Sequence, residues 1–104
     1  DKAENQSKLN GRGSNSMKQK ILEAILSGLL DKNVRFEDLR RLLQSLGFDE
    51  RIKGDHHIFY AESVAEIINL QPLRDGKAKA YQVKQVRNLV LKYKLHEEER
   101  DAQV

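Results

Sequence analysis

Cysteine is absent from this sequence of 104 residues. Its absence excludes disulfides, thiolate nucleophiles and cysteine-bound zinc, and it agrees with the reducing cytoplasm that we expect as the location. No apolar run approaches the roughly 18 residues that span a bilayer, so we expect no membrane partner. No internal repeat is visible. A chain of this length suits a single domain with one modest core.

Apolar side chains are scarce at the N-terminus, where Ala3 and Leu9 are the only ones before Met17. This segment has no hydrophobic stretch typical of a secretory signal. We interpret residues 1–16 as a disordered extension, either natural or left by an expression vector. One folded domain is predicted over residues 17–95. Residues 96–104 are predicted to form a polar C-terminal tail in which His96 is solvated.

Apolar residues recur at helical spacing in three segments. The first helix is predicted from Met17, with Ser16 as its cap and Gly28 as its end. The second carries Leu39, Leu42, Leu43 and Leu46 on one face and ends at Gly47, and the third runs from about Tyr81 to Leu95. Each helix has one apolar face, which predicts that all three pack against a common core.

Between the second and third helices the apolar residues change to a period of two, which is typical of strands. We predict strands at residues 48–53, 56–60 and 66–71, joined as an antiparallel meander that Pro72 ends. Residues 73–80 are predicted to form a flexible loop. The expected fold class is therefore α+β, a three-stranded antiparallel sheet with helices on one face, in the order ααβββα.

Positive charge is concentrated near the C-terminus. From Lys77 to Lys94 the chain has basic residues and no acidic one, whereas acidic side chains outnumber basic ones elsewhere; the six basic residues are Lys77, Lys79, Lys84, Arg87, Lys92 and Lys94. Helical periodicity predicts that Lys84, Arg87 and Lys94 face solvent. Lys77 and Lys79 precede a helix N-terminus, which favours a phosphate. The patch suits either a solubilising surface or the binding of a polyanion.

Two of the three histidines stand side by side in "GDHHIFY". Neighbouring side chains of a strand point to opposite faces, so His57 shares a face with Phe59, the best candidate for a core residue, and His56 faces solvent. The roles are exchanged if Ile58 is the core residue instead. The histidine spacing fits no metal site, and no serine elbow supports a nucleophilic triad. Acid–base catalysis and a purely structural role both remain open.

The runs "LRRLLQSLGF", "GDHHIFY", "EIINLQP" and "GKAKAYQVKQVRNLVLKYKL" resemble the HicA toxin family, also called YcfA-like mRNA interferases, over residues 34–95. The resemblance implies a fold similar to the double-stranded-RNA-binding domain, with the first helix as an N-terminal addition. It also implies an endoribonuclease toxin that cleaves mRNA without a cofactor or a metal. Its implied protein partner is a HicB-type antitoxin, through which alone it would contact DNA.

The family motif is a glycine, a small hydroxyl residue and the catalytic histidine, which correspond here to Gly54, Asp55 and His56. Asp55 departs from this pattern, as does Ala80, which stands where longer members tend to have proline. Asp55 can orient His56 or favour its imidazolium form, and it can also repel a phosphate. His57 is expected to be a supporting, structural residue.

The expected RNA-binding residues are Lys77, Lys79, Lys84 and Arg87. Two other functions compete with the nuclease: a non-catalytic RNA-binding module that recognises A-form shape through the backbone, and a subunit that mainly docks to the antitoxin.

Overall fold

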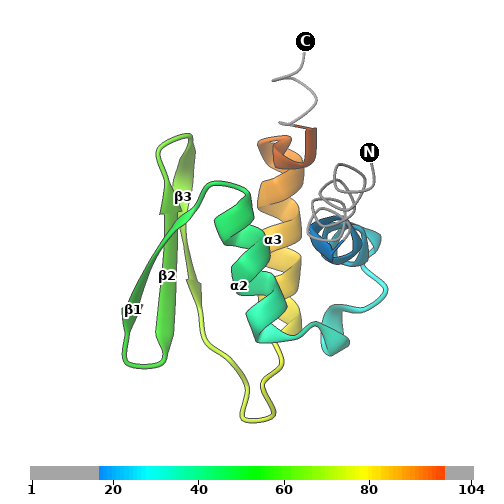
Figure 1. The fold of residues 1–104 in the computed structure, drawn as a ribbon, viewed down its shortest axis with the longest axis vertical. Coiled ribbons are helices and arrows are strands. Elements are labelled where there is room, and N and C mark those ends of the chain that lie inside the picture. Colours follow the sequence, from blue (N-terminus) through cyan, green and yellow to red (C-terminus); the bar gives the residue numbers. More distant parts are fainter. Residues whose placement is uncertain (1–16, 98–104) are drawn as a thin grey trace, which may run out of the picture.

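The computed structural model describes residues 17–97, so the predicted N-terminal extension, the Ser16 cap and most of the predicted tail lie outside the described residues. A helix over residues 17–27 comes first (Figure 1). It is followed by a short 3₁₀ helix η1 (Asp31–Asn33), helix α2 (Phe36–Ser45), strands β1 (Asp49–Lys53), β2 (His56–Ala61) and β3 (Val64–Leu70), helix α3 (Ala80–Lys92) and a second 3₁₀ turn η2 (Leu95–Glu97).

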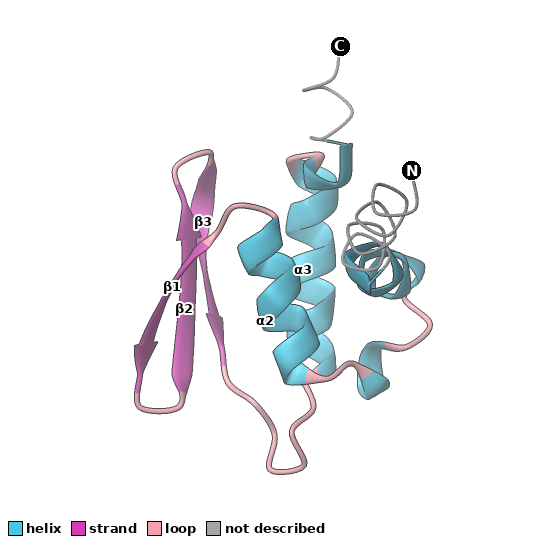
Figure 2. Cartoon of the chain, in the orientation of Figure 1, coloured by secondary structure: helices cyan, strands magenta, loops and turns pink. Residues whose placement is uncertain are grey.

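The predicted α+β fold class and the order ααβββα are confirmed. The three strands form one antiparallel sheet in the order β1-β2-β3. Helices α2 and α3 lie against one face of this sheet, and the helix of residues 17–27 lies on their far side (Figures 1 and 2). No element within residues 17–97 covers the other face of the sheet. Among residues 17–97 there is no helix of the length and apolarity required to cross a membrane.

The glycine ends that the sequence predicts for the first two helices are confirmed. The first helix stops at Ser27, and Gly28 follows with φ of +73°. Helix α2 stops at Ser45, and Gly47 follows with φ of +99° while its N–H donates to the Gln44 carbonyl. A positive φ at this position reverses the chain and directs Phe48 back into the core, where it is buried.

The predicted extent of the last helix is too long. Helix α3 ends at Lys92 because Lys94 adopts φ of +53°, which breaks the helical run, and η2 follows. This short turn buries Leu95 against the core. His96 is also largely enclosed, with a quarter of its side chain exposed, so the prediction of a solvated residue is wrong.

The sheet differs from the predicted strands only at their ends. β1 begins one residue later than predicted, and β3 begins two residues earlier, at Val64, which pairs with Ala61 across a tight turn. The loop after Pro72 is held to the segment before α2 instead of being free, because Phe36 N–H donates to the Gly76 carbonyl and Ala78 N–H donates to the Val34 carbonyl. These bonds bring the N-terminal ends of α2 and α3 together.

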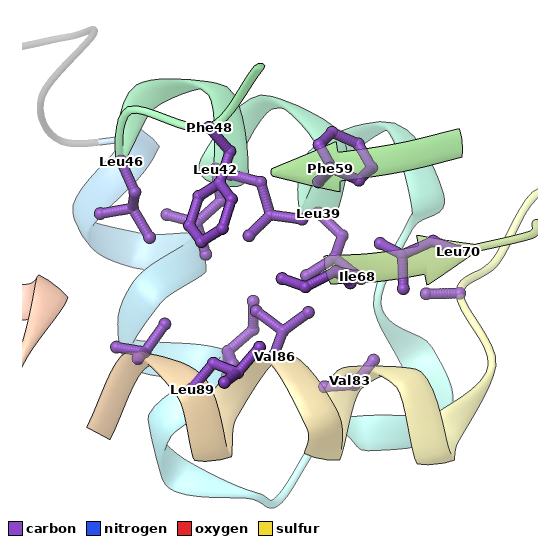
Figure 3. Close-up of a cluster of buried hydrophobic side chains, with 14 of the residues drawn as sticks. Leu39, Leu42, Leu46, Phe48, Phe59, Ile68, Leu70, Val83, Val86 and Leu89 are labelled. Carbon is purple, nitrogen blue, oxygen red and sulfur yellow. The ribbon is translucent and has the colours of Figure 1, made fainter. Parts of the chain in front are cut away.

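The core lies between the sheet and the two covering helices (Figure 3). Phe59, predicted as the core residue of β2, is fully buried, as are its neighbours on β3, Ile68 and Leu70. The helices contribute Leu39, Leu42, Val83 and Val86 to this layer. Burial of Phe59 fixes the orientation of β2: alternate residues His57 and Phe59 face the helices, and His56 faces outward.

Candidate functional site

The candidate catalytic histidine begins β2 directly after a tight turn. Lys53 and His56 are paired across the hairpin, so Gly54 and Asp55 form a two-residue loop. Gly54 has φ of +64°, whereas Asp55 has a negative φ. Glycine at the first central position is what a type II′ turn requires, and this turn matches the twist of the strands that it joins. The turn therefore fixes where Asp55 and His56 lie at the edge of the sheet.

Replacing Gly54 with alanine is expected to lower the free energy of unfolding by about 1–2 kcal/mol, the cost of a left-handed conformation for a residue with a Cβ. No atom lies within 4 Å of the position that this Cβ would take, so the cost comes from the backbone alone. Urea denaturation measures it, with Lys53→Ala in the same turn as the control. Equal stability of the two variants would contradict the assigned turn.

His56 is half exposed, and its ring is oriented by β3. Its Nδ1 lies 3.2 Å from the side-chain oxygen Oδ1 of Asn69. Because an amide oxygen only accepts hydrogen bonds, Nδ1 carries the proton, and the neutral ring has its lone pair on Nε2. That nitrogen lies 3.9 Å from an Asp55 carboxylate oxygen. The arrangement leaves Nε2 able to accept a proton while a negative charge stands beside it.

A chain of polar contacts links this carboxylate to the start of α3. Gln71 donates from Nε2 to Asp55 at 2.8 Å and accepts from Lys79 Nζ at 3.5 Å. The hydrogen bond from Gln71 and the nearby charges of His56 and Lys79 hold the pKa of Asp55 below its usual range, so Asp55 is ionised at neutral pH. Gln82 positions Gln71: once the oxygen and nitrogen of its side-chain amide are exchanged, the oxygen accepts from the Gln71 N–H and the nitrogen donates to the Gln71 carbonyl, both at 3.2 Å.

His57 has a structural environment, as expected. Its Nδ1 donates to Glu50 at 2.6 Å, and its ring packs edge-on against Phe36 with centroids 4.9 Å apart. Glu50 is nearly buried and also receives a two-pronged contact from Arg40 at 2.7 and 2.8 Å and a bond from Gln44 at 2.7 Å. Together these donors, Arg40 first, lower the pKa of Glu50 to about 2. His57 thus completes the shell of a buried carboxylate between α2 and the sheet.

The structure separates the four predicted RNA-binding residues. Lys79 is the N-cap residue of α3 and reaches the His56 group through Gln71. Lys77 points elsewhere and contacts Asn33 at 3.4 Å. Lys84 is exposed on α3 and, within residues 17–97, has no ion-pair partner. Only Lys79 of the four is therefore linked by contacts to the candidate catalytic group.

The prediction that Arg87 faces solvent is wrong. Its guanidinium is largely buried, donating to the Asp31 carboxylate at 2.9 Å and to the Ile25 carbonyl at 3.1 Å. It also lies over Gly28, 3.4 Å from the position that a Cβ would take there. Helical periodicity predicts correctly that Arg87 points away from the sheet. That side of α3 is not open to solvent, however, because the first helix packs against it. Arg87 ties these two helices together.

Replacing Arg87 with methionine is expected to lower the free energy of unfolding by about 2 kcal/mol, because a partly buried carboxylate loses its charged hydrogen-bond donor. Lys84→Met, three residues earlier on the same helix and exposed, is the matched control and should change stability by less than about 0.5 kcal/mol. Thermal and urea unfolding measure both. A neutral effect of Arg87→Met would show that the contact with Asp31 is not maintained in solution.

Several residues near His56 were missed by the sequence reasoning. Asn69 and Gln71 are not among the predicted site residues, although alternation along β3 puts both on the face of His56. Arg51 and Lys53 of β1 were not singled out either, yet they pair with Ile58 and His56. The alternation of side chains along β1 could have identified them. Once the register of the hairpin is known, this alternation places Arg51 and Lys53 on the outward face.

Within the described residues, no group of three or more His, Asp or Glu side chains could hold a metal ion. Comparisons of the chain with protein-family models, with curated proteins and with solved structures return no match.

Proposed function

We propose that the protein is an RNA-cleaving enzyme of the HicA toxin type, a metal-independent endoribonuclease acting on mRNA in the cytoplasm. The observation that supports it best is the environment of His56. Its ring is exposed, Asn69 holds the proton on Nδ1, and the accepting nitrogen Nε2 is directed to a region that also holds Asp55 and, through Gln71, Lys79. A general base needs this combination of access and fixed tautomer.

In the proposed reaction, Nε2 of His56 removes the proton of a ribose 2′-hydroxyl, and the 2′-oxygen attacks the adjacent phosphorus. The bond from phosphorus to the 5′-oxygen breaks, and this oxygen takes up a proton from water, while the imidazolium of His56 later releases its proton to solvent. The products end in a 2′,3′-cyclic phosphate and a 5′-hydroxyl. The ionised Asp55 stabilises the imidazolium that forms, and Lys79 offsets the charge that develops on the phosphate. Asp55 thus acts on His56, in place of the hydroxyl residue usual in the family.

The test uses a long single-stranded RNA in EDTA, with a 2′-O-methylated copy of the same sequence as the control. Fragments bearing cyclic phosphate ends, from the unmodified RNA alone, are expected, because the modified ribose has no 2′-hydroxyl to attack. Intact RNA of retarded mobility in both samples would favour the non-catalytic RNA-binding module. Intact RNA without retardation would argue against both cleavage and RNA binding, and would favour a subunit that mainly docks to the antitoxin.

The same resemblance leads us to propose a HicB-type antitoxin as the protein partner. Co-expression with such an antitoxin is expected to remove the growth arrest that the protein causes alone. Growth arrest that persists in the stable complex would argue against neutralisation by this partner.

A further inference from the structure

One face of the sheet is covered by no described helix (Figures 1 and 2). The register of the strands places apolar side chains on this face next to His56. Ile58 and Tyr60 of β2 and Ile67 of β3 belong to this face, because their neighbours Phe59 and Ile68 point into the core. Tyr60 is 41% exposed and Ile67 is 64% exposed. Large apolar side chains grouped on one exposed surface are typical of a binding site.

Positive charge borders this strip. Arg51 pairs with Ile58 and Lys53 pairs with His56, so both cations stand on the same face as the strip. Within residues 17–97 neither has an ion-pair partner, in contrast to Arg40, Arg87 and Lys92, which bind carboxylates. Two acidic side chains flank these cations: Asp49 pairs with Tyr60 at the end away from His56, and Asp55 lies in the turn beside His56. Arg51 and Lys53, which lie between these two carboxylates, are therefore available to bind phosphates.

We propose that this open face binds single-stranded RNA, with an unpaired base stacked on Tyr60 and with phosphates held by Arg51 and Lys53. The inference rests on the proposed function and names its substrate class, an unpaired strand. Stacking on an aromatic side chain requires a base with a free face. In a duplex these base faces are stacked and covered, and a protein contacts mainly phosphates and 2′-hydroxyls. An apolar strip forms no favourable contact with these polar groups.

The distance between His56 and Tyr60 along β2 determines whether both residues can contact the same nucleotide. Tyr60 is four residues from His56, about 13 Å along an extended strand. This distance is too long for both side chains to touch one nucleotide, so the base on Tyr60 belongs to a nucleotide next to the one that reacts at His56. The pairing of β2 with β3 is irregular between Phe59 and Ala61, at Tyr60. The extra residues lie on β3, which advances four residues from Val64 to Ile68 while β2 advances two. Tyr60 keeps its regular pairing with Asp49 of β1, so alternation directs its side chain to the open face.

The binding test uses His56→Ala as its background, so that the RNA stays intact. The probes are a fluorescent single-stranded RNA of twelve nucleotides without self-complementarity and the same strand in a duplex. In this background, Tyr60→Thr is expected to weaken binding of the single strand by about 5- to 150-fold, the loss of one stacked base, with little change for the duplex. Threonine keeps the strand preference of the position. Tyr60→Phe retains the ring and should bind as the parent does.

Two matched controls locate the binding surface. Tyr81 is an exposed tyrosine on α3, and Tyr81→Thr should leave the affinity unchanged. The binding constant falls as the salt concentration rises, so the slope of log K against log salt concentration is negative. Arg51→Ala and Lys53→Ala should each make this slope shallower by about 0.7, the value for one phosphate contact on a single strand. If Lys84→Ala made the slope shallower and these two variants did not, RNA would bind at the surface of α3, and the proposal would be overturned.

The outcomes separate this inference from the proposed function. Cleavage by the wild type, with binding that is insensitive to Tyr60→Thr, would overturn the open face as the RNA site and leave the nuclease standing. Binding that depends on Tyr60, without any cleavage by the wild type, would support the open face and reject the nuclease. A wild-type dimer that Tyr60→Thr converts to a monomer would show that the face joins two copies of the chain, and would also overturn the proposal.

Discussion

Replacing His56 with alanine is expected to slow RNA cleavage by about 10²- to 10⁴-fold, the usual contribution of a positioned general acid or base. The half-exposed ring makes one hydrogen bond, to Asn69, so the variant should remain folded. Initial rates on a short RNA at saturating concentration, with circular dichroism and thermal unfolding of the same samples, measure both effects. A rate close to that of the wild type would remove His56 from the mechanism.

The neighbouring histidine provides a matched control for this result. His57 has the same chemistry, but it faces Glu50 and Phe36 on the covered side of the sheet. His57→Gln should therefore lower the free energy of unfolding by about 1 kcal/mol, the value of a hydrogen bond in the core, and leave the cleavage rate of the folded protein nearly unchanged. A larger loss of activity in His57→Gln than in His56→Ala would reverse the two roles.

The fold was predictable from the sequence because its local signals agree with one another. The change of apolar period after Gly47, the turn at Gly54 and the stop at Pro72 delimit the sheet within one or two residues. The end of α3 was not predictable in this way, because Lys94 has no intrinsic preference for the left-handed conformation that ends the helix. Tertiary packing of Leu95 against the core determines that end.

The candidate site was only partly predictable. The outward direction of His56 follows from the burial of Phe59, which periodicity could anticipate. Its partners could not be identified, because Asn69 and Gln71 reach the group through the register between β2 and β3. The burial of Arg87 depends on how the first helix crosses α3, and no local pattern records that crossing. Properties of one strand or one helix were accessible from the sequence, whereas contacts between distant elements were not.

Replacing Arg40 with methionine is expected to lower the free energy of unfolding by about 3 kcal/mol at neutral pH, because it leaves a buried carboxylate without its cation. Arg40 donates to both oxygens of Glu50, whose side chain is only 8% exposed. Arg41→Met is the matched control, since Arg41 is adjacent on α2, exposed, and 3.7 Å from Glu37. Its loss should change stability by less than about 0.5 kcal/mol. Urea denaturation compares the two variants.

The dependence of stability on pH tests the cause of this loss. The pKa of Glu50 is lowered from 4.5 to about 2, first by Arg40, so its ionised form stabilises the folded chain. This contribution is complete above pH 4.5 and is lost as the pH falls toward 2, a total of about 3 kcal/mol. In Arg40→Met the pKa of Glu50 returns toward its ordinary value, so stability should fall less steeply between pH 5 and about 2 than in Arg41→Met. Both variants also remove a cation from Glu37, which lies 2.9 Å from Arg40 and 3.7 Å from Arg41, so Arg41→Met is a control for this second contact. Parallel curves would therefore show that Arg40 acts through packing of its side chain and not through its charge.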